Sequence, residues 1–382
     1  MSKPNSDKFV GCLLGCAIGD AIGCVIESRS RKNAAHFVEE IVSTKNWAGI
    51  TDLTYARDGS WVFGQYTDDT QLSRELARSI VENGGFDPES FSGRIANIFT
   101  TGAIVGGGAA TAEAARLLHL GAHWEESGTP PPRAGNGGAM RAGPIGLLHW
   151  NNSDALMRDA WNQAKITHAA EMSCATSVAV AMAVAMSLNA SRETSHPGER
   201  GWWDWLARFV ETSGSLDFAE DIRLLSLKHF KKEEKGSEIL KWILDEDHRM
   251  QEAITKSGPR WDGISPWSRT STLWALYAFM RSPKDFWKTL HTALLSGGDT
   301  DTIAAMACAL SGAYNGIDQF KDETDLLAAI HDNGKWNAVD LTGLAVELHE
   351  LATSEHPDNK EAPVLPINSE SAVTKIASPE RN

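Results

Sequence analysis

FVGCLLGCAIGDAIGCVIE, which spans residues 9–27, gives the clearest indication of the fold. The stretch is apolar and carries Gly11, Gly15, Gly19 and Gly23 at a spacing of four residues, so in a helix all four lie near one stripe. A stripe without side chains lets a second backbone approach closely, although glycine is costly inside a helix. The stretch therefore predicts a helix that packs tightly against a neighbour.

Two further stretches, residues 174–188 and 302–314, are rich in alanine and apolar nearly all round, as helices at the centre of a bundle are. Strand-like alternation hardly occurs. We expect an all-α fold, a compact orthogonal bundle of many helices. The other helices are predicted at residues 69–83, 87–100, 109–120, 153–167, 202–212, 217–228, 237–242, 270–280 and 283–295.

The pattern predicts one domain over residues 1–352, followed by a disordered tail over residues 353–382, which has four prolines and few apolar residues. Within the domain, residues 195–261 are rich in charge and tryptophan. We interpret this segment as peripheral helices packed on the main body, with its tryptophans as core anchors.

The composition excludes some classes of function. The 382 residues include 36 Lys and Arg against 50 Asp and Glu, and the net charge of -14 argues against general nucleic-acid binding. The apolar runs are interrupted before the roughly 18 residues of a membrane span, so we expect no membrane segment and a cytoplasmic monomer. The five cysteines are an odd number set in small-residue helical patterns, which predicts buried free thiols.

Two acidic clusters precede predicted helices. Tyr66-Thr67-Asp68-Asp69-Thr70 is the first, and Gly297-Gly298-Asp299-Thr300-Asp301-Thr302 is the second. One interpretation is N-capping, in which these side chains accept hydrogen bonds from the first turn of each helix. Capping needs one such oxygen per helix, however, and each cluster offers two carboxylates. If the helices are neighbours, the carboxylates converge and require cations, of which Mg²⁺, Mn²⁺ and Ca²⁺ suit oxygen ligands. Spacing alone leaves both interpretations open.

Other motifs are weak by themselves. The segment Gly135-Asn136-Gly137-Gly138-Ala139-Met140-Arg141 offers backbone N–H groups and a cation to an anion, but a turn before a helix explains its glycines equally well. His168, before a buried helix, suits a ligand contact or a structural hydrogen bond. Glu27 alone is typical of a solvated surface.

Taken together, these segments resemble the ADP-ribosylglycohydrolase family. The resemblance spans residues 11–316 and is carried, in order, by GCLLGCAIGDAIG (11–23), YTDDTQL (66–72), GNGGAMRAGPIGL (135–147), THAAEMSCATSVAVAMAV (167–184), GISPWSRTSTLWALYAF (263–279) and LLSGGDTDTIAAMACALSGAYNG (294–316). After His168 the chain departs from the family pattern, because many members continue with Pro and a second His.

The resemblance implies an all-α bundle with two Mg²⁺ or Mn²⁺ ions in a central cleft. It implies that the metal ligands are Thr67, Asp68, Asp69, Asp299, Asp301 and Thr302, with Glu27 as a glutamate that closes on the site. It also implies that ADP-ribose is held by Gly106, Gly107, Gly108, Asn136, Gly137, Gly138, Met140, Arg141 and His168.

The implied activity is metal-assisted hydrolysis of an N- or O-glycosidic bond between ADP-ribose and a protein side chain, with arginine as the first acceptor expected. Asp299 would take the proton of the attacking water, and Glu27 would orient a ribose hydroxyl or assist the leaving group. The alternatives are serine-linked or small-molecule conjugates, or a non-catalytic member of the same fold that binds ADP-ribose or has a structural role. The intact set of metal ligands favours catalysis.

Overall fold

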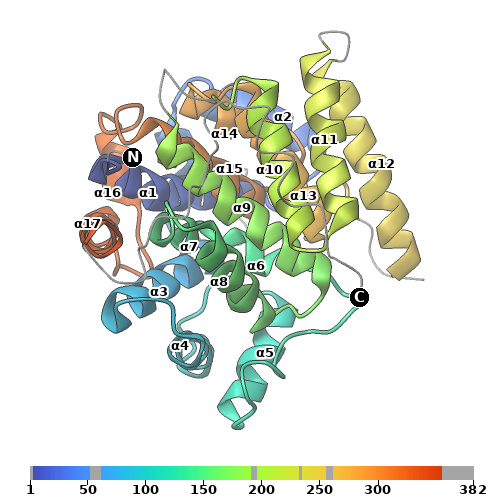
Figure 1. The fold of residues 1–382 in the computed structure, drawn as a ribbon. Coiled ribbons are helices and arrows are strands. Elements are labelled where there is room, and N and C mark those ends of the chain that lie inside the picture. Colours follow the sequence, from blue (N-terminus) through green and yellow to red (C-terminus); the bar gives the residue numbers. More distant parts are fainter. Residues whose placement is uncertain (1–2, 52–61, 191–195, 232–234, 255–260, 355–382) are drawn as a thin grey trace, which may run out of the picture.

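The computed structural model describes residues 3–51, 62–190, 196–231, 235–254 and 261–354. These residues form helices and no strand, which confirms the all-α class (Figure 1). The α-helices are α1 (Ser6–Gly23), α2 (Arg31–Phe37), α3 (Asp68–Asn83), α4 (Pro88–Thr100), α5 (Ala109–His119), α6 (Gly137–Met140), α7 (Gly143–Leu148), α8 (Ser153–Lys165), α9 (Glu171–Asn189), α10 (Arg200–Thr212), α11 (Leu216–Phe230), α12 (Gly236–Ile254), α13 (Ser268–Arg281), α14 (Phe286–Leu294), α15 (Thr300–Asn315), α16 (Thr324–Ala329) and α17 (Ala338–Thr353). Three short helical turns, η1 (Cys24–Ile26), η2 (Val38–Val42) and η3 (Trp47–Thr51), follow α1 and α2.

The glycine stripe of α1 lies against the backbone of α15. A Cβ added to the four glycines would lie 2.4, 2.4, 2.3 and 2.5 Å from carbonyl oxygens of α15, which belong in order to Gly312, Cys308, Ala304 and Thr300. The residue numbers fall in one helix as they rise in the other, so the two helices run antiparallel. The close approach expected from the sequence is therefore present, and it brings the end of α1 to the start of α15.

Two central segments, residues 6–26 and the whole of α9, are long and apolar enough to cross a membrane by length and composition alone. Both are almost wholly buried inside the fold. The expectation that the apolar runs are too short was therefore wrong. Their apolar surface is covered by neighbouring helices, as in the middle of a bundle.

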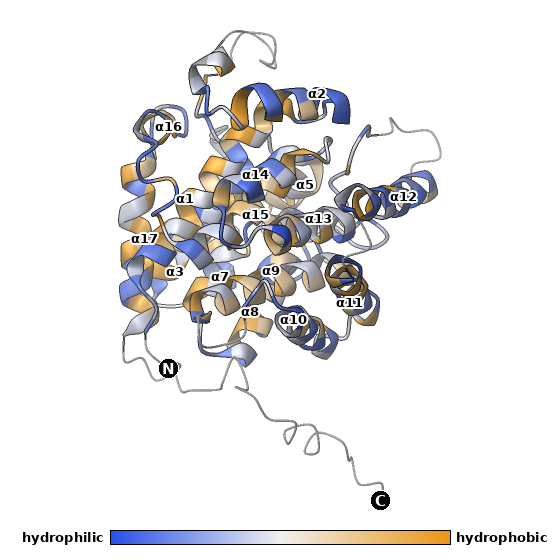
Figure 2. Cartoon of the chain, turned by 90° about the horizontal axis from the view of Figure 1, so that it is seen from above, coloured by the Kyte–Doolittle hydropathy of each residue, from blue (hydrophilic) through white to orange (hydrophobic). Residues whose placement is uncertain are grey.

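The charged and tryptophan-rich segment forms α10, α11 and α12, which lie at one side of the bundle and present hydrophilic residues outward (Figures 1 and 2). Trp202 and Trp203 are fully buried and pack on Phe279 of α13, so they anchor this layer. The helix predicted at 237–242 is present, but its predicted end was wrong, because α12 continues to Ile254. The predicted tail falls almost wholly on residues 355–382, which lie outside the described part of the chain.

All five cysteines are buried and free, as expected from their number and setting. Burial raises the pKa of the Cys12 thiol to about 12, and the pKa of Cys16 also lies well above its usual value. These groups are therefore neutral parts of the core.

Candidate metal centre

The start of α3 is fixed by a carboxylate from α1. Asp20 is fully buried, and its Oδ2 accepts hydrogen bonds from the backbone N–H of Thr67 and of Thr70, both at 3.0 Å. The hydroxyls of the same two threonines donate to the Asp20 carboxylate at 2.7 and 2.6 Å. Asp20 thus satisfies donors of the first turn of α3, which an N-cap residue usually does.

The two acidic clusters meet at this point. The carboxylate oxygen Oδ2 of Asp69 accepts a hydrogen bond from Thr67 Oγ1 at 3.1 Å and another from Thr302 Oγ1 at 3.3 Å. Thr67 belongs to the first cluster and Thr302 to the second. The convergence that the metal interpretation requires is therefore present in the structure.

Glu27, Asp299 and Asp301 bring ligand oxygens within 4.8 Å of one another. Asp299 and Asp301 are 4% and 5% exposed, whereas Glu27 is half-buried and lies where η1 ends. The loop of Glu27 is tied to the second cluster, because Ser28 N donates to the carbonyl oxygen of Gly298 at 2.8 Å. Glu27 therefore lies beside two of the predicted metal ligands, and its part in a metal site stays a prediction.

The carboxylates shift one another's pKa. Burial is the main cause that raises the pKa of Asp68 to about 8, and Asp20 adds to the effect. Burial and then Glu27 raise the pKa of Asp299 to about 7. The pKa values of Asp69 and Asp301 are also well above the usual range, for the same reasons. So many buried carboxylates ionise together only beside cations.

The N-capping interpretation fails for these residues. Neither Thr67 nor Asp299, which occupy the cap positions of α3 and α15, accepts a capping hydrogen bond through its side chain. The oxygen Oδ1 of Asp69 is buried and has no hydrogen-bond partner among the described residues. An unpartnered carboxylate oxygen surrounded by carboxylates and hydroxyls is the donor set that a hard divalent cation prefers. The residues present therefore fit a Mg²⁺- or Mn²⁺-type site.

The three glycines before α5 lie beside this site. The backbone N–H of Gly108 faces the Asp68 carboxylate and acts to lower its pKa, and a Cβ on Gly106 would lie 3.6 Å from Asp68 Oδ1. Gly106 has a φ of +76°, which a side chain disfavours. A Cβ on Gly107 would meet the Phe99 ring at 2.9 Å. This loop, predicted to bind substrate, is thus one wall of the carboxylate cluster.

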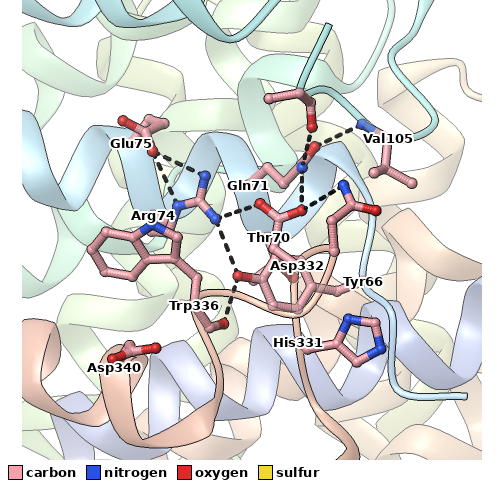
Figure 3. A network of polar contacts seen from close by, with 12 residues as sticks. Tyr66, Thr70, Gln71, Arg74, Glu75, Val105, His331, Asp332, Trp336 and Asp340 are labelled. Atoms are coloured by element: carbon pink, nitrogen blue, oxygen red, sulfur yellow. Dashed lines mark hydrogen bonds and ion pairs between the residues drawn. The ribbon is translucent and has the colours of Figure 1, made fainter. Parts of the chain in front are cut away.

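Gln71 of α3 binds the backbone segment that immediately precedes the three glycines. Its Nε2 donates to the carbonyl oxygen of Ala103 at 2.9 Å, and its Oε1 accepts from Val105 N at 2.8 Å. Figure 3 shows Gln71 and Arg74 side by side on Asp332, which accepts from them at 2.8 and 2.7 Å. The network fixes α3 and the glycine loop in one position.

The Gly135–Arg141 segment meets the cluster through Asn136. The side-chain amide of Asn136 donates to Asp299 Oδ2 at 2.6 Å and to the hydroxyl of Ser271 at 3.1 Å. Asn136 was predicted to contact substrate, whereas its observed hydrogen bond orients Asp299, a predicted metal ligand. Gly137, Gly138 and Met140 form the short helix α6 behind it and are buried.

Arg141 and His168 lie deeper than the sequence indicates. Arg141 is fully buried and donates to Gln163 and to Thr167 Oγ1, and burial lowers its pKa to about 9. The His168 ring packs on Gly137, where a Cβ would come within 2.5 Å of it. Burial lowers the pKa of His168 to about 3, so its imidazole is neutral. Both side chains are buried and pack against the Gly135–Arg141 segment and its neighbours. Their contact with a ligand stays a prediction.

Asp20 and Asp247 were not among the site residues predicted from the sequence. A carboxylate inside the apolar α1 was a usable signal, because a buried charge needs partners. Asp247 of α12 accepts hydrogen bonds from the hydroxyls of Ser265 at 2.9 Å and Thr270 at 2.5 Å. It thereby fixes the segment whose Ile264 carbonyl oxygen accepts from Asp299 N at 2.9 Å. The short helix predicted at 237–242 ended before Asp247, so this link was out of reach.

Comparison with known proteins identifies relatives of the chain. A sequence model described as ADP-ribosylglycohydrolase matches residues 1–358. The chain is 31% identical over 307 residues to an uncharacterised protein of Archaeoglobus fulgidus, which covers 80% of this chain and 87% of that protein. It is 28% identical over 349 residues to ADP-ribosylhydrolase ARH3 of Bos taurus, with 84% and 91% coverage. The human protein of the same name is 27% identical over 354 residues, with 84% and 92% coverage.

Among solved structures, the fold is similar to an ADP-ribosylglycohydrolase-related protein complex, with a TM-score of 0.63 and 22% identity. The similar region covers 91% of this chain and 99% of that one, and at this identity it shows the fold alone. The family model, by contrast, matches most of the chain, including both acidic clusters. The chain therefore belongs to the ADP-ribosylglycohydrolase family.

Proposed function

We propose that the chain is a metal-dependent hydrolase that cleaves the glycosidic bond between ADP-ribose and a protein side chain, with arginine as the first acceptor to test. The observation that carries the proposal is the convergence of the two acidic clusters, which Asp69 joins through Thr67 and Thr302. Family membership supports the choice of ADP-ribose conjugates as the substrate class. A protein that only binds ADP-ribose has no need of so many buried carboxylates.

Two divalent cations, Mg²⁺ or Mn²⁺, are proposed to be held by the carboxylates and hydroxyls of the two clusters. The six ligands are Thr67, Asp68, Asp69, Asp299, Asp301 and Thr302. When bound, such cations supply Lewis-acid stabilisation of negative charge and lower the pKa of water. The unpartnered Oδ1 of Asp69 and the raised pKa values of the carboxylates support their presence.

Asp299 is proposed to accept the proton of the water that attacks C1″ of the ribose next to the acceptor. Beside bound cations the Asp299 carboxyl is ionised, as a proton acceptor must be. The Asn136 amide holds one Asp299 oxygen in place and so fixes the direction of the carboxylate. Glu27, half-buried at the edge of the cluster, is placed to orient a ribose hydroxyl or to assist the leaving group.

The diphosphate and adenosine of ADP-ribose are proposed to lie along two glycine-rich walls. Gly106 and Gly108 border Asp68, and the loop of Asn136 borders Asp299. The absence of side chains lets a ligand approach the backbone N–H groups, which bind anions well.

The test measures release of free ADP-ribose from matched arginine-linked and serine-linked ADP-ribosyl peptides, with Mg²⁺, with Mn²⁺ and with chelator. We expect metal-dependent release, reduced by about a hundredfold or more in Asp301→Ala because a predicted metal ligand is lost. Asp318→Ala, at a carboxylate that is 78% exposed, is the matched control and should retain activity.

Release from the arginine-linked peptide alone would support arginine as the acceptor, and release from the serine-linked peptide alone would assign serine. No release from either, with ADP-ribose still bound, would replace the hydrolase with a small-molecule or binding role. Retention of most activity in both Asp68→Ala and Asp301→Ala would refute the metal-dependent mechanism.

A further inference from the structure

A cavity of about 980 Å³ lies away from the carboxylate cluster, between α2, η2, the start of α12, the end of α13 and α14. We call it the α2–α14 cavity, and its wall includes Val42, Leu240, Trp274, Trp287 and Leu295. None of the residues that line it belongs to the carboxylate cluster. Its volume is in the range of cavities that hold one small organic ligand.

The charge of this cavity is opposite to that of the whole chain. Arg31, Lys45, Lys235, Arg281 and Lys288 line it, and Asp285 is the one acidic residue among the described residues of the lining. The chain as a whole has a net charge of -14. A hollow lined by one sign of charge raises the local concentration of ions of the other sign.

Three of these cations have no carboxylate partner among the described residues. Lys45 pairs with Glu323, and Lys288 pairs with Asp285 at 2.9 Å. Arg31 and Lys235 have no side-chain hydrogen bond or ion pair in the described part of the chain, and Arg281 donates at 3.2 Å to a hydroxyl. Positive charge gathered without counter-charge is unfavourable until an anion binds.

Aromatic and aliphatic side chains complete the cavity. Lys45 Nζ lies 4.6 Å from the centre of the Trp287 ring, in a cation–π contact at the cavity wall. Trp274 and Leu240 form a buried apolar wall, with 2% and 5% exposure. A rigid ring fits such a wall, and phosphate groups fit the cations, especially the forked guanidinium of arginine.

We propose that the α2–α14 cavity binds an organic phosphate with a flat ring, that is, a ligand of the nucleotide class, at a site separate from the metal centre. The cavity adjoins the segments that position the centre. Arg31 N would lie 3.0 Å from a Cβ on Gly297, and Gly298 N donates to Arg29 O at 3.3 Å. The backbone of Arg31 therefore packs directly on the glycines that precede Asp299.

The test uses ATP as the probe and isothermal titration calorimetry in chelator, so that no divalent cation supports binding at the carboxylates. Wild-type protein should bind ATP, and adenosine, which lacks phosphates, should bind much more weakly. The charge-reversal pair Lys235→Glu/Arg281→Glu should weaken ATP binding by about tenfold or more.

The matched control is Arg116→Glu/Arg200→Glu, which changes the net charge equally at two exposed arginines outside the cavity. It should leave ATP affinity nearly unchanged. Ala35→Trp, at an exposed residue of α2 that lines the cavity, is a second variant that should block ATP by filling space. Circular dichroism and thermal unfolding establish that each variant is folded.

The proposal is overturned if wild-type protein does not bind ATP, or if both charge-reversal pairs weaken ATP equally. It is also overturned if ADP-ribose displaces ATP while Ala35→Trp binds ATP normally, because ATP would then occupy the metal cleft. These outcomes are independent of hydrolysis, so failure here leaves the proposed function intact.

Discussion

Asp20 accepts hydrogen bonds from both the backbone N–H and the hydroxyl of Thr67, at 3.0 and 2.7 Å. This contact joins α1 to Thr67 of the first acidic cluster, which occupies the N-cap position of α3. Because Thr67 Oγ1 also bonds to Asp69, the position of Asp20 helps to determine the position of a predicted metal ligand. Asp20 therefore links the packing of the core helices to the geometry of the site.

Asp20→Asn should weaken both the fold and the site. The side-chain amide replaces one acceptor oxygen by a donor, and it faces the N–H and hydroxyl donors of Thr67 and Thr70. We expect a loss of about 2 kcal/mol in the free energy of unfolding. Mn²⁺ affinity should fall by about ten- to a hundredfold, because the carboxylate orients ligands.

Urea unfolding in chelator and calorimetric titration with Mn²⁺ measure these two effects. Asp340→Asn is the control, since Asp340 caps α17 from an exposed position. It should cost about 1 kcal/mol or less and leave Mn²⁺ affinity unchanged. Equal Mn²⁺ affinity in Asp20→Asn and the wild type would contradict the positioning role.

Asn136→Ala should lower the rate of hydrolysis more than it lowers the affinity for substrate. The amide fixes Asp299 Oδ2, so its loss lets the carboxylate rotate away from the direction that proton transfer needs. We expect kcat to fall by about ten- to a hundredfold with a smaller change in KM. Ser271→Ala, which removes the other partner of the amide, should have a milder effect of the same kind. A rise in KM at constant kcat would instead assign Asn136 to substrate binding.

Much of the fold was predictable because the helices are long and strongly patterned. The helix predicted at 69–83 begins at Asp68 and ends at Asn83, and the one predicted at 302–314 lies within α15. The length of α12 was not predictable, because charged residues interrupt its second half. That half is held by tertiary bonds from Asp247 to Ser265 and Thr270.

The candidate site was only partly predictable, for a similar reason. Two acidic clusters at helix starts were visible in the sequence, and the glycine stripe predicted that α1 has a close helical neighbour. Nothing local identified that neighbour as α15, and the bond from Asp20 to Thr67 spans 47 residues. The burial of Arg141 could not be predicted from the sequence either. A single arginine after a glycine-rich segment is as well suited to the surface as to the core.

The stability of the metal-free protein should fall as the pH rises from 7 to 8. A carboxyl whose pKa is raised by folding stabilises the fold fully below its unfolded pKa of about 3.9, and this contribution is lost as the pH rises through the folded pKa. The folded pKa values of Asp299 and Asp68 are about 7 and 8, so the loss continues through this window. His168, with its lowered pKa, acts in the opposite direction, but only below its unfolded pKa of about 6.5.

Thermal unfolding in chelator at pH 7 and pH 8 measures this effect, and Mn²⁺ should raise the Tm more at the higher pH. Asp68→Asn removes one of the titrating groups, so its Tm should depend less on pH than that of the wild type. A wild-type Tm that is constant or rises across the window, with no difference from Asp68→Asn, would show that the carboxylates are not strained by mutual repulsion.

Alanine substitutions along the glycine stripe should separate core packing from metal binding. At Gly15 a Cβ would lie 2.4 Å from Cys308 O, and at Gly23 it would lie 2.5 Å from Thr300 O and 2.6 Å from the Cα of Asp301. Both variants should lose about 2 kcal/mol or more, since overpacking outweighs the gain in helix propensity of about 1 kcal/mol. Gly23→Ala should also weaken Mn²⁺ binding, because the displaced backbone carries a predicted ligand.

Gly93→Ala is the control, as its Cβ meets nothing within 4 Å on an exposed face of α4, and it should stabilise the protein by about 0.5–1 kcal/mol. Urea unfolding and Mn²⁺ titration of the three variants measure these effects. Equal losses of Mn²⁺ affinity in Gly15→Ala and Gly23→Ala would contradict the separation of core packing from metal binding.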